Sequence, residues 1–571
     1  MPAHTAAAST PLTAPAVAAP VPAPAPRRGP SLLPAATALV LLVAIALRLR
    51  QYLYGRSLWV DEAFLALNIA ERSFAELARP LGWDQTAPIL FLWLERASVL
   101  LFGTHEQALR ALPLLVGIAV VPAVYALAAG LLGRVPGLVA AAAAAISPLL
   151  VRYANEVESY GVDALTTAVL ALLTRRVLAA PRDGRAWLAL GAAGVVAVVG
   201  STPSVFVLAG VGLTLLAAPD VRRAPRGVAR TLLLGAVWVA FFGVVYVALL
   251  RAAAGSEFLR QFFAPAFLSP SAPHLDGRLV EAVWRTVHPL LFPPALPVAL
   301  KLLVVGTAAA GLVTLARRHG AHLLPLFVVP FAAAFAAAVL EQYPIIPRTM
   351  LFAAPLLITL LVAGGLAVTG WLPRALARPA RALAAAALLA PLAVQAVRDV
   401  RSPWHDWDVR PVVQDMARRG GPRDPVYVSY YARPGYAFYT TNWAAPDRAR
   451  LTWLDLAKSP RAPGDRMLPD PGDGSDPFAR SHAGRTEIVE RLPPGLRRDF
   501  DGVARAPTPA PAWADGEARR LRPHANPYLW VLNAGSRERL AVVNALERLG
   551  GRVVYRNAVW PNMYLYRLRF D

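Results

Sequence analysis

Residues 31–47 read SLLPAATALVLLVAIAL, and the chain continues RLRQYLYGRSLWVDEA to residue 63. An apolar run of about 17 residues is long enough to cross a bilayer as a helix. It leads into Arg48 without a small-residue cleavage site, so we interpret it as an uncleaved first span rather than a signal peptide. Two adjacent carboxylates, Asp61 and Glu62, then follow at the level of the lipid headgroups. Ionisable groups so close to a membrane are costly and tend to mark function. The plain alternative is that they begin a solvated amphipathic helix.

The composition of the whole chain also indicates a membrane protein. Its 571 residues are 56% hydrophobic and only 16% charged, with a mean hydropathy of +0.44, which is too apolar for a soluble protein of this size. The net charge of +22 does not indicate a nucleic-acid partner, because the basic residues lie in short gaps between apolar segments. The chain has no cysteine, which excludes disulfides, thiolate metal sites and cysteine nucleophiles.

Further apolar segments predict about eleven spans in total. After the first, they lie near 107–132, 135–151, 159–174, 187–201, 203–218, 231–250, 297–316, 321–340, 349–371 and 382–397. Only Gly200-Ser-Thr-Pro203 separates two of them, and counting these as one gives ten. Arginines fill alternate short loops, a pattern that places the N-terminus in the cytoplasm. Residues 51–106, 152–158, 251–296, 341–348 and everything after about 398 are then outside.

Three parts of the chain differ in composition. Residues 1–30 are rich in Ala and Pro and predict a disordered cytoplasmic tail. Residues 31–398 form the expected transmembrane domain, with 51–106 as a long outer catalytic loop. Residues 399–571 alternate helical and extended patterns and predict a soluble extracytoplasmic α/β domain. Its expected helices are 407–419 and 536–549, and its expected strands are 425–431, 528–532, 553–555 and 563–568. The predicted fold class is thus an α-helical polytopic membrane protein with a C-terminal α/β domain.

Four polar clusters fall on the outer face in this topology. They are Asp61 and Glu62 with Arg56 and Trp59; Asp84 with Gln85; Arg152, Tyr153, Asn155, Glu156, Glu158 and Tyr160; and Glu341, Tyr343 and Arg348. Each cluster alone is also typical of an ordinary interfacial loop, where Tyr and Trp lie at the headgroup level. Their coincidence on one face of a many-span protein favours a shared site.

Sugar transfer from a lipid phosphate is chemistry that needs such an arrangement. An acceptor hydroxyl loses its proton as it attacks, so a positioned carboxylate acts as base. The departing phosphate needs arginine or a divalent cation. We predict Asp61 as the base, Glu62 or Asp84 as metal ligands, and Arg348 or Arg152 as phosphate partners. Direct displacement would invert the anomeric centre, without the nucleophilic carboxylate of a retaining enzyme.

Several stretches resemble a known family over about residues 35–370. They are Leu58-Trp-Val-Asp-Glu-Ala63, Asp84-Gln-Thr-Ala-Pro-Ile-Leu-Phe-Leu92, Leu101-Phe-Gly-Thr-His-Glu-Gln-Ala-Leu-Arg110, Ser147-Pro148 with Tyr153-Ala-Asn-Glu156 and Tyr160, and Tyr343-Pro-Ile-Ile-Pro-Arg348. The chain resembles the C-type membrane glycosyltransferases of the protein O-mannosyltransferase, aminoarabinose transferase and rhizobial galacturonosyltransferase group. The resemblance implies that Asp61 matches the essential acidic residue of the first outer loop. It also implies a polyprenyl-phosphate sugar donor and, in some members, a divalent cation (Mg, Mn or Zn) near the phosphate.

The predicted site then has two further groups of residues. Donor phosphate is expected at Arg348, Arg152, Tyr343 and Arg56, and substrate at Tyr153, Glu156, Tyr160 and Gln85. One departure stands out, because Glu158 occupies a position where relatives often carry a basic residue.

The predicted function is an inverting glycosyltransferase of the bacterial inner membrane that serves an extracytoplasmic lipid, glycan or protein acceptor. One alternative is a lipid-linked sugar transporter or flippase, which would need polar residues deep inside several spans. Here the polarity gathers at one face, which favours an enzyme. Another alternative is a membrane-anchored cell-envelope binding or assembly protein that acts through residues 400–571. The sequence does not specify the sugar, the lipid length or the acceptor.

Overall fold

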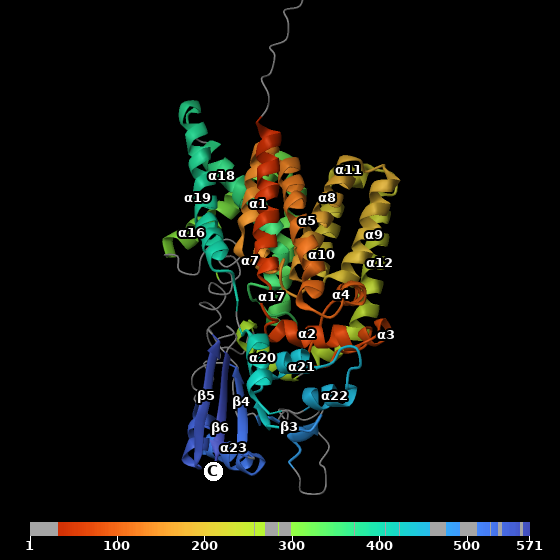
Figure 1. The fold of residues 1–571 in the computed structure, drawn as a ribbon. Helices are drawn as coiled ribbons and strands as arrows, with labels where there is room; N and C mark the ends of the chain where they lie inside the picture. Colours follow the sequence, from red (N-terminus) through yellow and green to blue (C-terminus); the bar gives the residue numbers. More distant parts are fainter. Residues whose placement is uncertain are drawn as a thin grey trace, which may run out of the picture.

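The structure is a computed structural model. It describes residues 32–255, 257–268, 284, 298–370, 372–405, 407–421, 423–456, 476–491, 511–525, 527–534, 540–559 and 563–571. An elongated bundle of helices forms one end of the molecule, and a β-sheet forms the other (Figure 1). The predicted disordered tail lies outside the described residues.

Eleven apolar helices form the bundle in the described part of the chain, one for each predicted span. They are α1 (Leu33–Tyr54), α5 (Glu106–Leu132), α6 (Arg134–Ile146), α8 (Tyr160–Ala179), α9 (Gly184–Gly200), α10 (Ser204–Ala217), α12 (Gly227–Val245), α16 (Val298–His319), α17 (Leu324–Val339), α18 (Ala354–Gly370) and α19 (Arg374–Arg401). Six helical stretches among the described residues are long and apolar enough to cross a membrane. The count of eleven spans therefore stays a prediction, whereas the helical membrane fold is confirmed.

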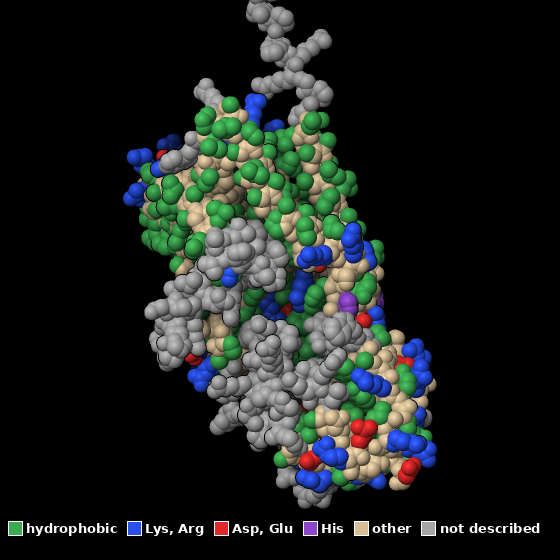
Figure 2. Space-filling view, turned by 90° about the vertical axis from the view of Figure 1, so that its left-hand side faces the viewer, with side chains coloured by type: hydrophobic (Ala, Val, Ile, Leu, Met, Phe, Trp, Pro, Cys, Tyr) green, Lys and Arg blue, Asp and Glu red, His purple; other side chains and the backbone are tan. Residues whose placement is uncertain are grey.

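Short elements connect these helices. They are α7 (Pro148–Arg152), α11 (Pro219–Arg223), the π-helix η1 (Tyr246–Leu250), α13 (Arg251–Ala254), α14 (Glu257–Phe263), and the 3₁₀ turns η2 (Ala264–Ala266), η3 (Ala321–Leu323) and η4 (Thr349–Ala353). The outer surface of the bundle is apolar: Leu42 on α1, Val239 on α12 and Leu383 on α19 are all well exposed. Hydrophobic side chains cover this end of the molecule (Figure 2), as expected of a surface that faces lipid.

The first outer loop begins where α1 ends. Gly55 adopts a left-handed conformation with φ 63°, and its N–H bonds to the carbonyl of Tyr52, a common way to close a helix. The loop then forms α2 (Val60–Glu71), α3 (Phe74–Leu77) and α4 (Ile89–Phe102). Helix α2 lies across the end of the bundle nearest the sheet (Figure 1). The start of α2, with Asp61 and Glu62, therefore lies between the two parts of the molecule.

The C-terminal part contains a six-stranded sheet in the order β2-β3-β1-β4-β6-β5. Its elements are α20 (Val409–Arg419), β1 (Val426–Val428), α21 (Arg433–Thr440), α22 (Arg448–Leu456), β2 (Ala479–His482), β3 (Arg485–Val489), α23 (Pro511–Leu521), η5 (Arg522–His524), β4 (Tyr528–Ala534), α24 (Leu540–Arg548), β5 (Gly551–Val559) and β6 (Met563–Phe570). Strand β1 is parallel to β3 and β4, and the remaining pairs are antiparallel. The predicted α/β character is confirmed.

One hydrophobic core joins the outer loop to this sheet. It contains Leu65 and Ile69 of α2, Val412 of α20 and Trp530 of β4, all essentially buried. A second core, which includes Ala518 and Leu546, packs the other face of the sheet beneath α23 and α24. The C-terminal part therefore supports the outer loop directly, rather than hanging from a flexible linker.

Candidate active site

Asp61 pairs with Arg348, a residue 287 positions away in the chain. Asp61 is the second residue of α2, and Arg348 immediately precedes η4. The guanidinium donates a short hydrogen bond to the carboxylate, and the side chains keep 23% and 17% exposure for Asp61 and Arg348 respectively. The pair is thus neither fully buried nor fully exposed to solvent. Charged side chains of both signs gather in a hollow between the apolar bundle and the C-terminal part (Figure 2).

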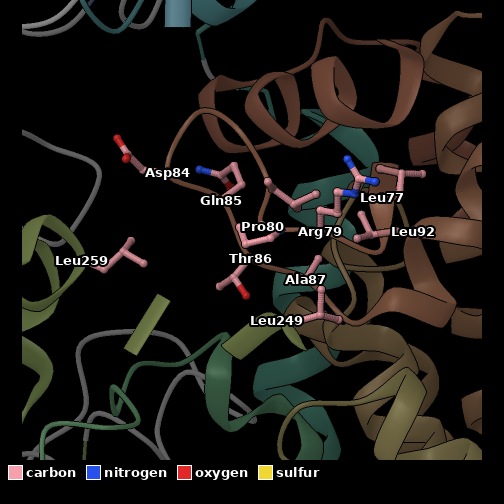
Figure 3. Close-up of a pocket in the computed structure, with 11 residues that line it drawn as sticks. Leu77, Arg79, Pro80, Asp84, Gln85, Thr86, Ala87, Leu92, Leu249 and Leu259 are labelled. Atoms are coloured by element: carbon pink, nitrogen blue, oxygen red, sulfur yellow. The ribbon is translucent and has the colours of Figure 1, made fainter. Parts of the chain in front are cut away.

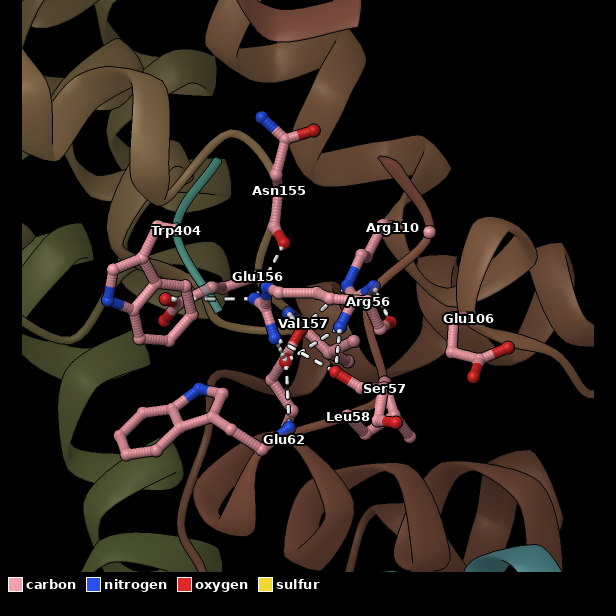
Figure 4. A network of polar contacts seen from close by, with 12 residues as sticks. Arg56, Ser57, Leu58, Glu62, Glu106, Arg110, Asn155, Glu156, Val157 and Trp404 are labelled. Carbon is pink, nitrogen blue, oxygen red and sulfur yellow. Dashed lines mark hydrogen bonds and ion pairs between the residues drawn. The ribbon is translucent and has the colours of Figure 1, made fainter. Parts of the chain in front are cut away.

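Glu62, the next residue, is fully buried among cations. Its carboxylate forms ion pairs with Arg56 at 2.5 Å and with Arg110 at 2.8 Å (Figure 4). It also accepts the backbone N–H groups of Trp59 and Val157, at 3.2 and 3.0 Å. Burial raises the pKa of Glu62, but the two guanidinium groups outweigh it, and the net pKa is about 2. Glu62 therefore acts as the anion that organises this cluster.

This geometry argues against the predicted metal role of Glu62. Both of its oxygens are already engaged by guanidinium and N–H donors, whereas a metal ligand needs free lone pairs. Among the described residues, no group of three or more His, Asp or Glu side chains could hold a metal ion. The predicted role of Asp84 as a metal ligand stays a prediction.

The two arginines predicted with Arg348 for phosphate binding differ in access. Arg56 is 3% exposed and is occupied by Glu62, the carbonyl of Asn155 and the ring of Trp404. Its two terminal nitrogens are thus already engaged, and its predicted role in phosphate binding stays a prediction. Arg152 keeps 28% side-chain exposure while it pairs with Glu156 at 2.6 Å. Its guanidinium carbon lies 3.6 Å from the centre of the Trp404 ring.

The residues predicted to bind substrate around position 156 are mostly buried. Tyr153 is 4% exposed and packs edge-on against Tyr160, with ring centres 5.0 Å apart. Glu156 is inaccessible and lies between Arg152 and Arg56, 3.8 Å from the latter. Burial raises the pKa of Glu156, and the two arginines oppose that rise. These groups shape the wall of the site, and Tyr160 alone among them is only half-buried.

Tyr343 positions the turn that carries Arg348. Its hydroxyl donates to the carbonyl of Thr349 at 2.6 Å, and its ring packs edge-on against Phe206 at 5.1 Å. The side chain is 9% exposed. The hydroxyl proton is thus engaged in holding the turn in place, and the predicted contact of Tyr343 with the donor phosphate stays a prediction.

Asp84 and Gln85 line a separate open pocket of about 140 Å³ (Figure 3). The pocket combines polar groups of the outer loop with Leu249 and Leu259, and Asp61 is not among its lining residues. Trp83 and Asp84 both have positive φ angles, 62° and 54°, a strained conformation for non-glycine residues that is often found at functional sites. The structure therefore does not join Asp84 or Gln85 to the Asp61–Arg348 pair.

Two residues that contact the site, Trp404 and Arg110, were not predicted as site residues from the sequence. Trp404 covers both Arg56 and Arg152, and Arg110 is the strongest partner of Glu62. Arg110 ends a quoted motif, so its place could have drawn attention, but nothing near Trp404 signals its distant partners. Glu158 is half-buried and interacts electrostatically with Arg348 and Asp61.

Comparisons with known proteins show which family the chain is similar to. Residues 86–247 match the family model of dolichyl-phosphate-mannose-protein mannosyltransferases. The predicted resemblance to the C-type membrane glycosyltransferases is confirmed. The matched stretch contains the 152–160 cluster but begins just after Asp84 and Gln85, and Asp61 and Arg348 lie on either side of it. No curated protein matches the chain.

Solved structures of similar architecture include ArnT from Cupriavidus metallidurans bound to undecaprenyl phosphate. It is 15% identical with a TM-score of 0.49, and the match covers 94% of this chain and 97% of ArnT. An Archaeoglobus fulgidus oligosaccharyltransferase in complex with Zn and sulfate is 12% identical with a TM-score of 0.44. That match covers 86% of this chain and 67% of the archaeal protein.

Proposed function

We propose that this membrane glycosyltransferase takes a sugar from a polyprenyl phosphate and transfers it, with inversion, to an acceptor on the extracytoplasmic side. One observation carries the proposal: the partly exposed Asp61–Arg348 pair, which joins the first outer loop to the turn before η4. It combines a base and a cation at one accessible point, as the reaction requires.

The chemical step assigns one role to each member of the pair. The acceptor hydroxyl attacks the anomeric carbon, and its proton passes to the Asp61 carboxylate. The bond between that carbon and the phosphate oxygen breaks, and its electron pair leaves with the phosphate. Arg348 stabilises the negative charge that develops there, by a charge-assisted hydrogen bond. A single displacement of this kind inverts the anomeric centre.

The buried cluster supports this role by fixing the start of α2. Glu62 is adjacent to Asp61 and is held by Arg56, Arg110 and the N–H of Val157. The base therefore projects from a helix end whose position is set by two ion pairs and a backbone hydrogen bond. Rigid supporting contacts of this kind are what a positioned catalytic group needs. Because the described residues include no group of three or more His, Asp or Glu side chains that could hold a metal ion, arginine takes the phosphate charge in this proposal.

The transporter alternative requires charged side chains along a path through the spans. Arg48 of α1 is such a charge, but it is fully buried. Its guanidinium donates to the carbonyls of Ala145 and Ala144, at 2.9 and 3.2 Å. Arg48 thus ties α1 to α6, and we retain the enzyme as the proposal.

The test is sugar transfer by purified Asp61→Asn and Arg348→Ala proteins. We expect Asp61→Asn to lower kcat by about 10²–10⁴-fold, the usual contribution of a general base. We expect Arg348→Ala to raise the donor KM by roughly ten- to a hundredfold, the loss of one charge-assisted hydrogen bond. Asp515 and Arg548 form an exposed pair on the C-terminal part, so Asp515→Asn and Arg548→Ala are matched controls. Unchanged rates in both site variants would remove the proposed base and phosphate partner.

A further inference from the structure

Glu158 emerges beside the catalytic pair from a loop with a fixed backbone. It lies between α7 and α8, and its N–H donates to the carbonyl of Glu156 at 2.8 Å. The preceding N–H, that of Val157, donates to the buried carboxylate of Glu62 at 3.0 Å. The loop is therefore anchored to the buried cluster, while the Glu158 side chain is only half-buried. This carboxyl has no part in the mechanism described above.

Among the described residues, no cation near Glu158 pairs with it alone. Arg348, from the turn before η4, is the only guanidinium among the strongest electrostatic influences on it, and Arg348 is already bonded to Asp61. The other groups that face Glu158 are Asp61 and Glu62 from α2 and Glu156 from its own loop, together with the neutral phenols of Tyr153 and Tyr160. The nearby arginines Arg56, Arg110 and Arg152 form ion pairs with Glu62 and Glu156 instead. A further negative charge at this point would lie among carboxylates.

We propose that Glu158 contributes to donor binding as a neutral carboxylic acid that donates a hydrogen bond to the donor phosphate, so that donor affinity depends on its proton. The proposal rests on the proposed function, because it assumes a lipid phosphodiester beside Arg348. A sugar phosphodiester carries one negative charge throughout the neutral pH range. A charged Glu158 would repel that phosphate, whereas a protonated Glu158 supplies a donor to it.

The electrostatics agree with this geometry. Burial raises the pKa of Glu158 well above its ordinary value; Arg348 opposes the rise, and Asp61, Glu156 and Glu62 reinforce it. A bound phosphate adds another negative charge and therefore favours the protonated form further. By linkage, donor binding takes up a proton from solvent wherever Glu158 is ionised in the free protein. Donor affinity then falls as the pH rises through the range in which Glu158 ionises.

The experiment measures the binding of a polyprenyl methyl phosphate to the full-length protein in detergent. This probe has the lipid and the single phosphodiester charge but no sugar, so the unknown sugar does not matter and the probe itself does not titrate. Binding is compared between about pH 5 and about pH 9 for the wild type, Glu158→Gln and Glu158→Ala. Glu547→Gln, an exposed carboxyl on α24, is the control.

For the wild type we expect the Kd to rise with pH, by up to about tenfold per pH unit for one coupled proton. Glu158→Gln, which keeps a hydrogen-bond donor without ionising, should bind as tightly as the wild type at low pH and lose the pH dependence. Glu158→Ala should also be independent of pH but weaker, and Glu547→Gln should follow the wild type.

A wild-type pH dependence that persists in both Glu158 variants would overturn the inference and leave the proposed function intact. The proposed donor class fails differently: the wild type would then not bind the phosphodiester at any pH.

Discussion

Two neighbouring carboxylates in this chain have opposite environments. Consecutive residues of a helix project about 100° apart, so Asp61 faces the accessible side of α2 while Glu62 faces the interior. Asp61 shares one arginine and keeps access to solvent, as a base needs. Glu62 is shielded from solvent and balances two arginines. The pair therefore divides into a reactive group and a structural one.

Glu62→Gln should destabilise the folded protein rather than only lower its rate of sugar transfer. Removing one charge from a buried pair leaves the partner cations uncompensated, at a cost of about 3–5 kcal/mol. Thermal unfolding in detergent should show a clearly lower melting temperature for this variant and an unchanged one for Glu547→Gln. A normal melting temperature with lost activity would instead indicate a direct catalytic or metal role for Glu62.

The pH dependence of stability gives a second readout of the same residue. The folded pKa of Glu62, about 2, is below the ordinary value of about 4.3 for an unfolded chain. Its contribution is therefore fully present above about pH 4.3 and is lost as the pH falls towards about 2. Wild-type stability should fall over this acid range more steeply than that of Glu62→Gln.

For single residues, the sequence predicts on which side of the membrane a residue lies but not which side chains it contacts. The alternation of arginine-rich loops assigned residues 61 and 348 to one side, and their contact agrees with that assignment. The position of a residue in a loop does not show which way its side chain points, however. The sequence therefore could not show that Arg56, Glu62 and Tyr343 are buried rather than exposed. Those depend on contacts with Arg110, Asn155 and Thr349, which only the fold brings together.

Helix α2 is held from the opposite side by the C-terminal part. The Tyr439 hydroxyl of α21 accepts the N–H of Leu58 at 2.8 Å and donates to Glu106 at 2.8 Å. Arg410 of α20 pairs with the same Glu106 at 2.7 Å. Asp408 accepts from Ser57, three residues before α2. These contacts set the position of the helix end that carries Asp61.

Tyr439→Phe should lower kcat by loosening that helix end. The change removes two partly buried hydrogen bonds, worth about 1–3 kcal/mol together, and keeps the ring in its core position. We expect a lower kcat with little change in donor KM, measured by initial rates. In the described part of the chain the buried Tyr566 hydroxyl has no hydrogen-bond partner, so Tyr566→Phe is the matched control and should leave kcat unchanged. Equal rates for the two variants would show that the C-terminal contacts do not position the base.

Elements with a strong pattern were predictable, and short ones were not. Each predicted span contains a helix, and the expected strand at 528–532 lies within β4. Strands β2 and β3 were missed because Ala479–Val489 contains Arg, Ser, His, Gly and Glu among few apolar residues. The two strands pair with each other as an antiparallel hairpin, and β3 joins the sheet through β1, to which it runs parallel. That second contact is long-range, and no local pattern shows it.

At the scale of the molecule, the C-terminal part completes the fold of the outer loop. Its core is continuous with that of α2 through residues such as Leu65 and Trp530, and polar contacts such as that of Trp83 with Asp455 add to it. A composition-based boundary near residue 399 cannot reveal this, because both parts look complete by pattern. The alternative of a separate binding module acting through residues 400–571 therefore has less structural support than a shared catalytic unit.

The proposed reaction depends on which side of the membrane this unit faces. The start of α1 and helix α11 lie at the end of the bundle opposite the sheet (Figure 1), and α11 carries Arg222 and Arg223. The positive-inside rule assigns that end to the cytoplasm, so the Asp61 site should face outward.

The chain has no cysteine, so any introduced one is a unique label. Arg182 lies in an exposed loop at the predicted inner face, and Asn544 is exposed on α24. In spheroplasts, a membrane-impermeant maleimide should label Asn544→Cys directly and Arg182→Cys only after permeabilisation. The detergent-solubilised proteins, in which both sites should react, control for accessibility. The reverse labelling would put Asp61 on the cytoplasmic side and rule out an extracytoplasmic acceptor, whatever the activity of the site.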